Sequence, residues 1–179
     1  MPFIETKIPG VIIFEPRIFT DDRGYFFETY NEKVFKEGGI DADFVQDNQS
    51  KSSYGVIRGL HFQKGEHAQA KLVRVLQGTV LDVAVDLRSG SETFGRHVAV
   101  ELSDVNNLQL FIPRGFAHGF SVLSKTAVFA YKCDNFYCKE SEGGINCADP
   151  DLEIDWQIPV ENAHLSEKDK ILPRLKECF

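Results

Sequence analysis

Short runs of β-branched and aromatic residues, separated by Gly, Asp, Asn and Ser, follow one another along most of the chain. Runs of this kind are typical of β-strands, and strands spaced so closely predict a sandwich or a barrel. Two runs joined at Gly78 predict adjacent strands that bend at the glycine, with Asp82 and Asp86 alternating with apolar residues at a period of two. The runs are Val11–Glu15, Tyr25–Tyr30, Val56–Phe62, Lys71–Leu76, Thr79–Leu87, His97–Leu102, Leu108–Ile112, Phe120–Leu123 and Ala127–Lys132.

Helical signals are confined to the two ends of the chain. Asn31 is a good N-cap for a short helix that stops at Gly38, and Ser166 opens another helix before Pro173. No repeat, linker or low-complexity tract divides the chain, and 179 residues fit one domain of ordinary size. The sequence therefore predicts an all-β fold in a single domain, residues 1–179, with short helices near the N- and C-terminal ends.

The charge balance argues against several classes of partner. A formal net charge of -7 does not suit a protein that must neutralise a nucleic-acid backbone with clustered Lys and Arg. No apolar run approaches the roughly 20 residues that span a bilayer, and the first ten residues lack the pattern of a signal peptide. We therefore expect a cytoplasmic protein with no nucleic-acid or membrane partner.

The cysteines give no sign of a metal site or of disulfides. They form no C-x-x-C pair and have no histidine at zinc spacing, so we expect reduced thiols. The four positions are Cys133, Cys138, Cys147 and Cys178.

Two stretches carry a glycine, proline and histidine spacing that is similar to a known pair of motifs. They are GVIRGLHFQ, which starts at Gly55, and IPRGFAHGF, which starts at Ile112. The spacing resembles the two motifs of the cupin superfamily, whose fold is a double-stranded β-helix or jelly-roll barrel. A metal-binding cupin has a second histidine two positions after His61, where this chain has Gln63, and an amide is a poor ligand for a transition metal. We therefore expect no metal at His61 and His118.

Polar side chains that are costly to bury lie on strands that are otherwise apolar. Burial of such groups needs anions or mutual pairing to offset its cost, so the sequence predicts an internal cationic pocket in an acidic protein. Lys71 and Arg74 are three positions apart, so on one strand their side chains point to opposite faces, and we expect Arg74 to point outward to solvent. The set comprises Arg58, His61, Lys71, Arg74, His118 and Tyr131.

Longer motifs extend this likeness over nearly the whole chain. Together they resemble the dTDP-4-dehydrorhamnose 3,5-epimerase family, in that family's order. The resemblance implies a cofactor-free isomerase that inverts C3 and C5 of a dTDP-linked 4-keto-6-deoxyhexose, in the route to dTDP-L-rhamnose. The motifs are FTDDRGYFFETYN from Phe19, FVQDNQSKSSYGVIRGLHFQ from Phe44, KLVRVLQGTVLDVAVDLRSGSETFG from Lys71, IPRGFAHGFSVL from Ile112, FAYKCDNFY from Phe129, EGGI from Glu142 and LSEKD from Leu165.

The resemblance also implies catalytic roles. His61 would be the base, and Asp169 would orient its imidazole. Lys71 would stabilise the developing enolate, and Tyr131 would be the acid that returns a proton from the opposite face of the ring. Taken alone, Ser166 and Asp169 also form a helix capping box, and both roles can hold together.

The remaining matches imply substrate binding. The family is dimeric, and its N-terminal strand reaches the site of the neighbouring subunit, so we expect a homodimer in which part of this set serves the partner chain. Tyr137 suits stacking on the base, and His118 would line the sugar pocket. The implied substrate-binding residues are Arg23, Phe26, Glu28, Gln46, Asn48, Arg58, His118, Tyr137 and Glu142.

The chain departs from the family pattern at two places, and other functions stay open. Cys147 stands where the family usually has tryptophan, and Gln157 where it often has proline. An enzyme that inverts C3 alone would use the same base and ketone. A cupin that binds a nucleotide sugar without turning it over, and a metal-dependent cupin oxygenase, are the alternatives from other classes.

Overall fold

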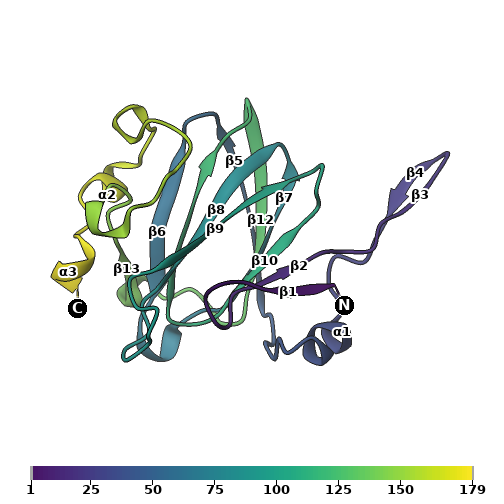
Figure 1. Ribbon diagram of the computed structural model, residues 1–179, viewed down its shortest axis with the longest axis horizontal. Coiled ribbons are helices and arrows are strands. Elements are labelled where there is room, and N and C mark those ends of the chain that lie inside the picture. Colours follow the sequence, from purple (N-terminus) through teal and green to yellow (C-terminus); the bar gives the residue numbers. More distant parts are fainter. Residues whose placement is uncertain (1, 179) are drawn as a thin grey trace.

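The computed structural model describes residues 2–178, and two antiparallel sheets packed face to face form its body (Figure 1). The larger sheet has the order β1-β2-β10-β7-β12-β5 and the smaller one β13-β6-β11-β8-β9. This arrangement confirms the predicted all-β, cupin-type jelly roll. The larger sheet contains β1 (Phe3–Glu5), β2 (Ile12–Phe14), β10 (Gln109–Ile112), β7 (Lys71–Gln77), β12 (Thr126–Cys133) and β5 (Gln46–Ser53). The smaller sheet contains β13 (Glu142–Gly144), β6 (Ile57–Gln63), β11 (Phe116–Val122), β8 (Thr79–Asp86) and β9 (His97–Ser103).

Short helices lie near both ends of the chain, as predicted. Asn31 caps α1 through a hydrogen bond from the Val34 amide, and Ser166 caps α2 by accepting from the Asp169 amide. Among the described residues, no helix is long and apolar enough to cross a membrane. The helices are α1 (Glu32–Glu37), α2 (Glu167–Lys170) and α3 (Leu175–Cys178), with 3-10 turns η1 (Gly65–His67), η2 (Lys139–Ser141), η3 (Pro150–Leu152) and η4 (Val160–Asn162).

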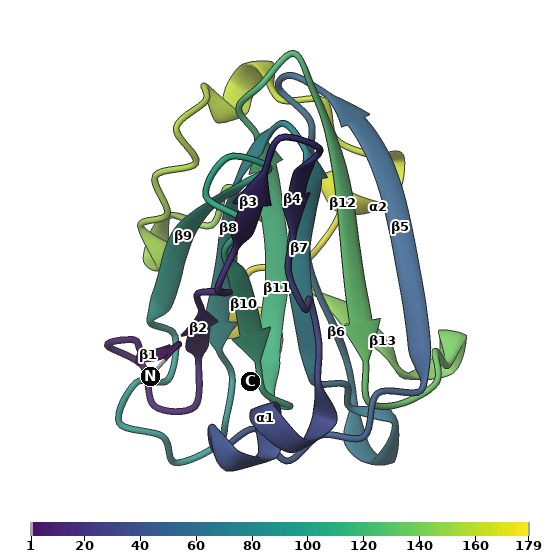
Figure 2. The same cartoon turned by 90° about the vertical axis from the view of Figure 1, so that its right-hand side faces the viewer.

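Three apolar clusters hold these layers together. The first fills the space between the two sheets and includes Val73, Leu110 and Phe129. The second packs the C-terminal segment, with Trp156, onto the outer face of the smaller sheet. The third packs Phe35 of α1 against one end of the larger sheet, which Figure 2 shows face on. Burial of these side chains is the main favourable contribution to folding.

The structure corrects three strand predictions. β7 and β8 are consecutive in the chain but belong to opposite sheets, because the single residue Gly78, with φ of 83°, carries the chain from one sheet to the other. The run Tyr25–Tyr30 is a strand only as far as Phe26. β5, with the sequence QDNQSKSS, was not predicted because a polar strand at the edge of a sheet has no apolar run.

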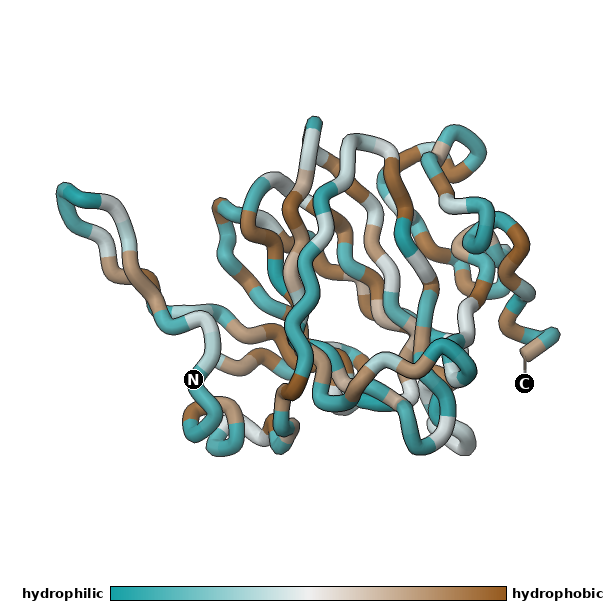
Figure 3. The backbone as a smooth tube through the Cα atoms, turned by 180° about the vertical axis from the view of Figure 1, so that it is seen from behind, coloured by the Kyte–Doolittle hydropathy of each residue, from teal (hydrophilic) through white to brown (hydrophobic). Residues whose placement is uncertain are grey.

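One hairpin extends away from the body of the molecule. It consists of β3 (Phe19–Asp21) and β4 (Gly24–Phe26), which pair only with each other. Its tip is hydrophilic and its stem is apolar (Figure 3). Tyr25 and Phe26 are both about two-thirds exposed, at 66% and 67%. Aromatic side chains so exposed on an isolated arm are typical of a surface that a partner covers.

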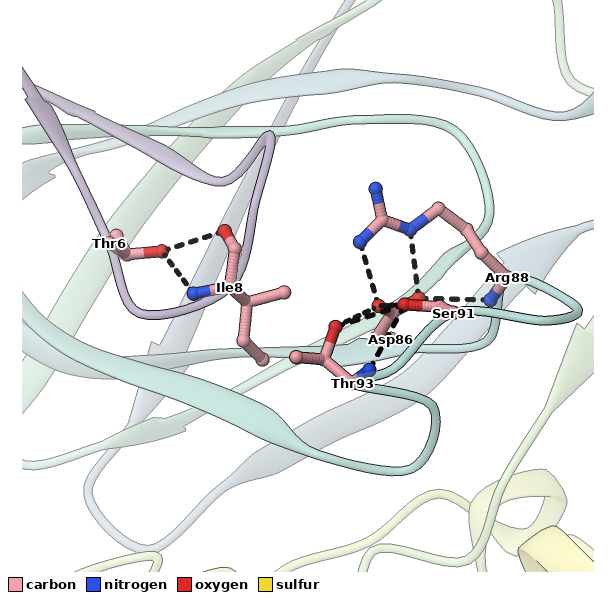
Figure 4. Close-up of polar contacts among 6 residues, drawn as sticks. All are labelled: Thr6, Ile8, Asp86, Arg88, Ser91 and Thr93. Atoms are coloured by element: carbon pink, nitrogen blue, oxygen red, sulfur yellow. Dashed lines mark hydrogen bonds and ion pairs between the residues drawn. The ribbon is translucent and has the colours of Figure 1, made fainter.

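A buried carboxylate stabilises the loop between β8 and β9 (Figure 4). Asp86 is fully buried, and its oxygens accept hydrogen bonds from Arg88, Ser91 and Thr93 at 2.6 to 2.9 Å. Burial alone would raise the pKa of Asp86, but the bonds from these three residues outweigh it and hold the pKa well below 3.8. The group is therefore ionised throughout the neutral range.

We expect Asp86→Asn to lower the free energy of unfolding by about 2–4 kcal/mol at pH 7, because Arg88 loses its buried counter-charge. A lowered folded-state pKa contributes stability that is complete above 3.8 and is lost as the pH falls through the folded value. Urea unfolding should therefore show a smaller difference in the free energy of unfolding between wild type and variant at pH 3 than at pH 7. Asp104→Asn, at an exposed position, is the matched control. An equal difference in the free energy of unfolding at both pH values would contradict the stabilising role of the Asp86 carboxylate.

Candidate active site

A cavity of about 620 Å³ opens between the two sheets and is closed on one side by the C-terminal segment. Both sheets contribute side chains to it, so its walls come from strands far apart in the sequence. Of the predicted site residues, it collects Asn48, Arg58, His61, Lys71, His118, Tyr131, Glu142 and Asp169. Five of the six polar residues predicted for an internal pocket therefore line this cavity, although Arg58 is exposed and Arg74 lies elsewhere.

His61 and Asp169 form a hydrogen-bonded pair in this cavity. His61 lies on β6, Asp169 lies on α2, and His61 Nε2 is 2.6 Å from Asp169 Oδ1. Burial raises the pKa of Asp169, but the hydrogen bonds with His61 and Ser166 lower it more, and the net pKa is below its usual value. An ionised carboxylate can only accept a hydrogen bond, so Nε2 of His61 carries the proton that is donated to Asp169. Nδ1 is then the nitrogen that can act as a base.

His118, a second histidine that lines the cavity, is also paired with a carboxylate. His118 Nε2 is 2.9 Å from Asp82 Oδ2, and both residues are buried. Burial lowers the pKa of His118 despite the nearby carboxylate, so the imidazole is neutral at pH 7. Within residues 2–178, no three His, Cys, Asp or Glu side chains are grouped to hold a metal ion. The Nε2 atoms of His61 and His118 both bind carboxylates.

Lys71 and Tyr131 lie on the wall opposite His61. They come from β7 and β12 of the larger sheet, and Lys71 Nζ is 5.8 Å from the centre of the Tyr131 ring. Burial lowers the pKa of Lys71 and raises that of Tyr131. The Tyr131 phenol therefore keeps its proton at neutral pH and can donate it.

A chain of polar contacts continues from the lining residues Asn48 and Glu142 to Gln46 and Tyr137, which lie beside the cavity at the end that we call its mouth. Gln46 donates to Asn48 Oδ1 at 3.2 Å and accepts from the Tyr137 amide at 3.2 Å. The Tyr137 hydroxyl donates to Glu142 at 2.9 Å, and Arg58 Nε donates to Ser52 at 3.0 Å. The structure therefore brings Gln46, Asn48, Tyr137 and Glu142 together at this mouth. Arg58 lies toward the other end of β5, beside Ser52.

Three predicted site residues lie elsewhere in the chain. Arg23 and Phe26 are on the exposed hairpin, where Arg23 pairs with Asp21. Glu28 follows the hairpin and accepts from Asn31 at 3.2 Å. Within one chain these residues do not line the cavity of His61.

Arg74 points away from the cationic cavity, as its strand parity predicts. It lines a separate hollow of about 350 Å³ on the outer face of the larger sheet, together with Asp47 and Lys132. Burial there lowers the pKa of Arg74. The guanidinium therefore points outward, as predicted, but is half-buried.

Sequence reasoning missed several residues of the site. His164 and Lys168 line the cavity from the C-terminal segment, beside Asp169. The motif that contains Asp169 could have indicated them, since residues next to Asp169 in the sequence lie on or beside the four-residue helix α2 and so close to the cavity. Asp82 could have been identified as a buried carboxylate in an apolar strand. Cys147 is buried under Trp156, whose indole donates to the Cys147 carbonyl at 2.8 Å.

The comparisons with known proteins agree with this geometry. The family model described as dTDP-4-dehydrorhamnose 3,5-epimerase matches residues 5–177. An enzyme of that name from Shigella flexneri is 55% identical over 170 residues, covering 94% of this chain and 93% of the relative.

Two solved structures of similar chains share the fold. The enzyme of the same name from Elizabethkingia anophelis has a TM-score of 0.93 and 60% identity, covering 98% of this chain and 96% of its own. A dTDP-6-deoxy-D-glucose-3,5-epimerase from Legionella pneumophila, in complex with dTDP-4-keto-L-rhamnose, has a TM-score of 0.93 and 51% identity, covering 97% and 92%.

The fold, the paired histidine and carboxylate, and these relatives define a sugar-nucleotide epimerase of the cupin type, which is an isomerase. The chain belongs to the dTDP-4-dehydrorhamnose 3,5-epimerase family.

Proposed function

We propose that this protein inverts C3 and C5 of dTDP-4-dehydro-6-deoxy-D-glucose to give dTDP-4-dehydro-L-rhamnose. The observation that carries the proposal is the position of the His61–Asp169 pair on one wall of the cavity and of Tyr131 on the other. Inversion requires a proton to leave one face of the sugar ring and to return on the opposite face. A base and an acid on opposite walls meet that requirement.

The proton transfers use side chains of this protein. Nδ1 of His61 removes the proton next to the C4 ketone, and Asp169 stabilises the resulting imidazolium. Lys71 stabilises the enolate oxygen as charge develops there. Tyr131 then gives its proton to the same carbon from the other side. Water takes the proton from His61 and returns one to Tyr131, and the cycle is repeated at the second carbon.

The cavity and its mouth together bind the nucleotide in this proposal. Arg58 contacts the diphosphate, Gln46 and Asn48 donate to polar atoms of the nucleotide, and Tyr137 stacks on the base. His118 and Glu142 contact the substrate from inside the cavity.

The active form is a homodimer in this proposal. Arg23, Phe26 and Glu28 serve the cavity of the neighbouring protomer, since the hairpin that carries Arg23 and Phe26 extends away from its own body. The exposed aromatic residues of this arm would then be covered.

The stereochemistry of the product tests the proposal. Purified protein incubated with dTDP-4-keto-6-deoxyglucose should give, by proton NMR, a sugar inverted at both C3 and C5. A product inverted at C3 alone would identify the protein as a 3-epimerase. An unchanged sugar that still binds would identify a nucleotide-sugar-binding protein.

A further inference from the structure

One carboxylate at the edge of the cavity holds two neighbours at once. Glu142 Oε1 is 2.5 Å from Lys168 Nζ, and Glu142 Oε2 accepts the Tyr137 hydroxyl at 2.9 Å. Burial raises the pKa of Glu142, but the bonds from Lys168 and Tyr137 lower it more, and the net pKa is below its ordinary value. Both oxygens of this side chain are therefore engaged within the protein.

The Lys168 end of this contact reaches the catalytic pair. Lys168 precedes Asp169 on α2, and a helix of four residues has little stability of its own. Glu142 lies on β13, which pairs with β6 so that Glu142 faces Gln63 and Gly144 faces His61. The Glu142–Lys168 ion pair thus connects α2, which carries Asp169, to β13, the strand that pairs with β6. The 2.6 Å hydrogen bond between His61 and Asp169 connects α2 to β6 itself.

The Tyr137 end reaches the mouth of the cavity. The Tyr137 amide donates to Gln46, and Gln46 in turn donates to Asn48. Tyr137 itself is 53% exposed, so a ligand at the mouth can contact its ring. A continuous chain of polar contacts therefore runs from the mouth through Glu142 to α2.

We propose that the Tyr137–Glu142–Lys168 chain couples occupancy of the nucleotide end of the cavity to the alignment of His61 with Asp169. The inference rests on the proposed function, in which the nucleotide binds at this mouth. Lys168 acts on the reaction as a positioning residue, and Glu142 connects it to the nucleotide end of the cavity. Nucleotide binding energy is then used to align the base.

The test follows the His61 imidazole by ¹⁵N NMR in the absence and presence of dTDP, which has no sugar to react. In wild type, dTDP should shift the His61 signals. In Tyr137→Phe, which keeps the ring and loses the hydroxyl, dTDP at saturation should cause less than about half of that shift. Lys168→Gln should likewise lose the shift, and its kcat should fall at least about fivefold.

Lys170→Gln is the matched control on the same helix. Lys170 pairs with Glu167 of α2 at 2.6 Å and does not reach β13, so this variant should keep the dTDP-induced shift and a kcat within about twofold. The inference is overturned if dTDP leaves His61 unshifted in wild type, or shifts it equally in Tyr137→Phe and Lys168→Gln. Wild-type turnover tests the proposed function separately, and it can succeed while the coupling fails.

Discussion

His61→Ala is expected to slow exchange of the sugar protons with solvent by at least about 10²-fold. The variant removes the only imidazole that is paired with Asp169, and water in its place is a far weaker base than Nδ1. Binding of dTDP should stay nearly intact, because the proposed nucleotide contacts, including that of Arg58 on the same strand, do not involve the His61 imidazole. Proton NMR in heavy water measures the exchange, and calorimetry with dTDP measures the binding.

His67→Ala is the matched control for this variant. His67 follows β6 in the turn η1, is partly exposed and does not line the cavity. It should exchange sugar protons at the wild-type rate. Wild-type exchange in His61→Ala would assign the base to another group, and no exchange in any form would favour the nucleotide-sugar-binding alternative.

Tyr131→Phe is expected to separate proton removal from inversion. His61 still removes the proton, but the opposite wall lacks a donor, so the proton returns mainly from the side it left. Formation of inverted product should fall at least about 10²-fold, while deuterium enters C3 within about tenfold of the wild-type rate. Phenylalanine keeps the packing on Phe129, whose ring centre is 6.1 Å away, so the fold should be unaffected.

The Tyr131 experiment has its own control. Tyr54→Phe removes a hydroxyl from an exposed turn between β5 and β6 and should leave both rates unchanged. Undiminished inversion in Tyr131→Phe would show that another group supplies the second proton. Because burial raises the pKa of Tyr131, wild-type inversion should not decline through loss of this proton at neutral pH.

The central strands could be predicted from the sequence because they are apolar on at least one face. β8 is buried nearly throughout, and its runs of Val, Leu and Ala identify it. β5 could not be predicted this way, since it lies at the edge of the sheet and its residues alternate between half-buried and exposed. The change of sheet at Gly78 depends on packing between distant strands, which a local pattern does not contain.

The site was predictable to the extent that motifs carry it. His61 and Asp169 are 108 positions apart, so only the family resemblance linked them before the structure brought them to 2.6 Å. The pairing of His118 with Asp82 follows from the register of β11 on β8. The contact between Glu142 and Lys168 depends on how α2 lies against β6 and has no signal in either motif.

Deuterium labelling of the wild-type reaction tests the central claim most directly. The claim is that His61 removes protons next to the C4 ketone and that solvent-derived protons return on the opposite face. In heavy water, NMR of the product should show deuterium at both C3 and C5 and at no other ring carbon. Inverted product that carries no deuterium at either position would contradict the account.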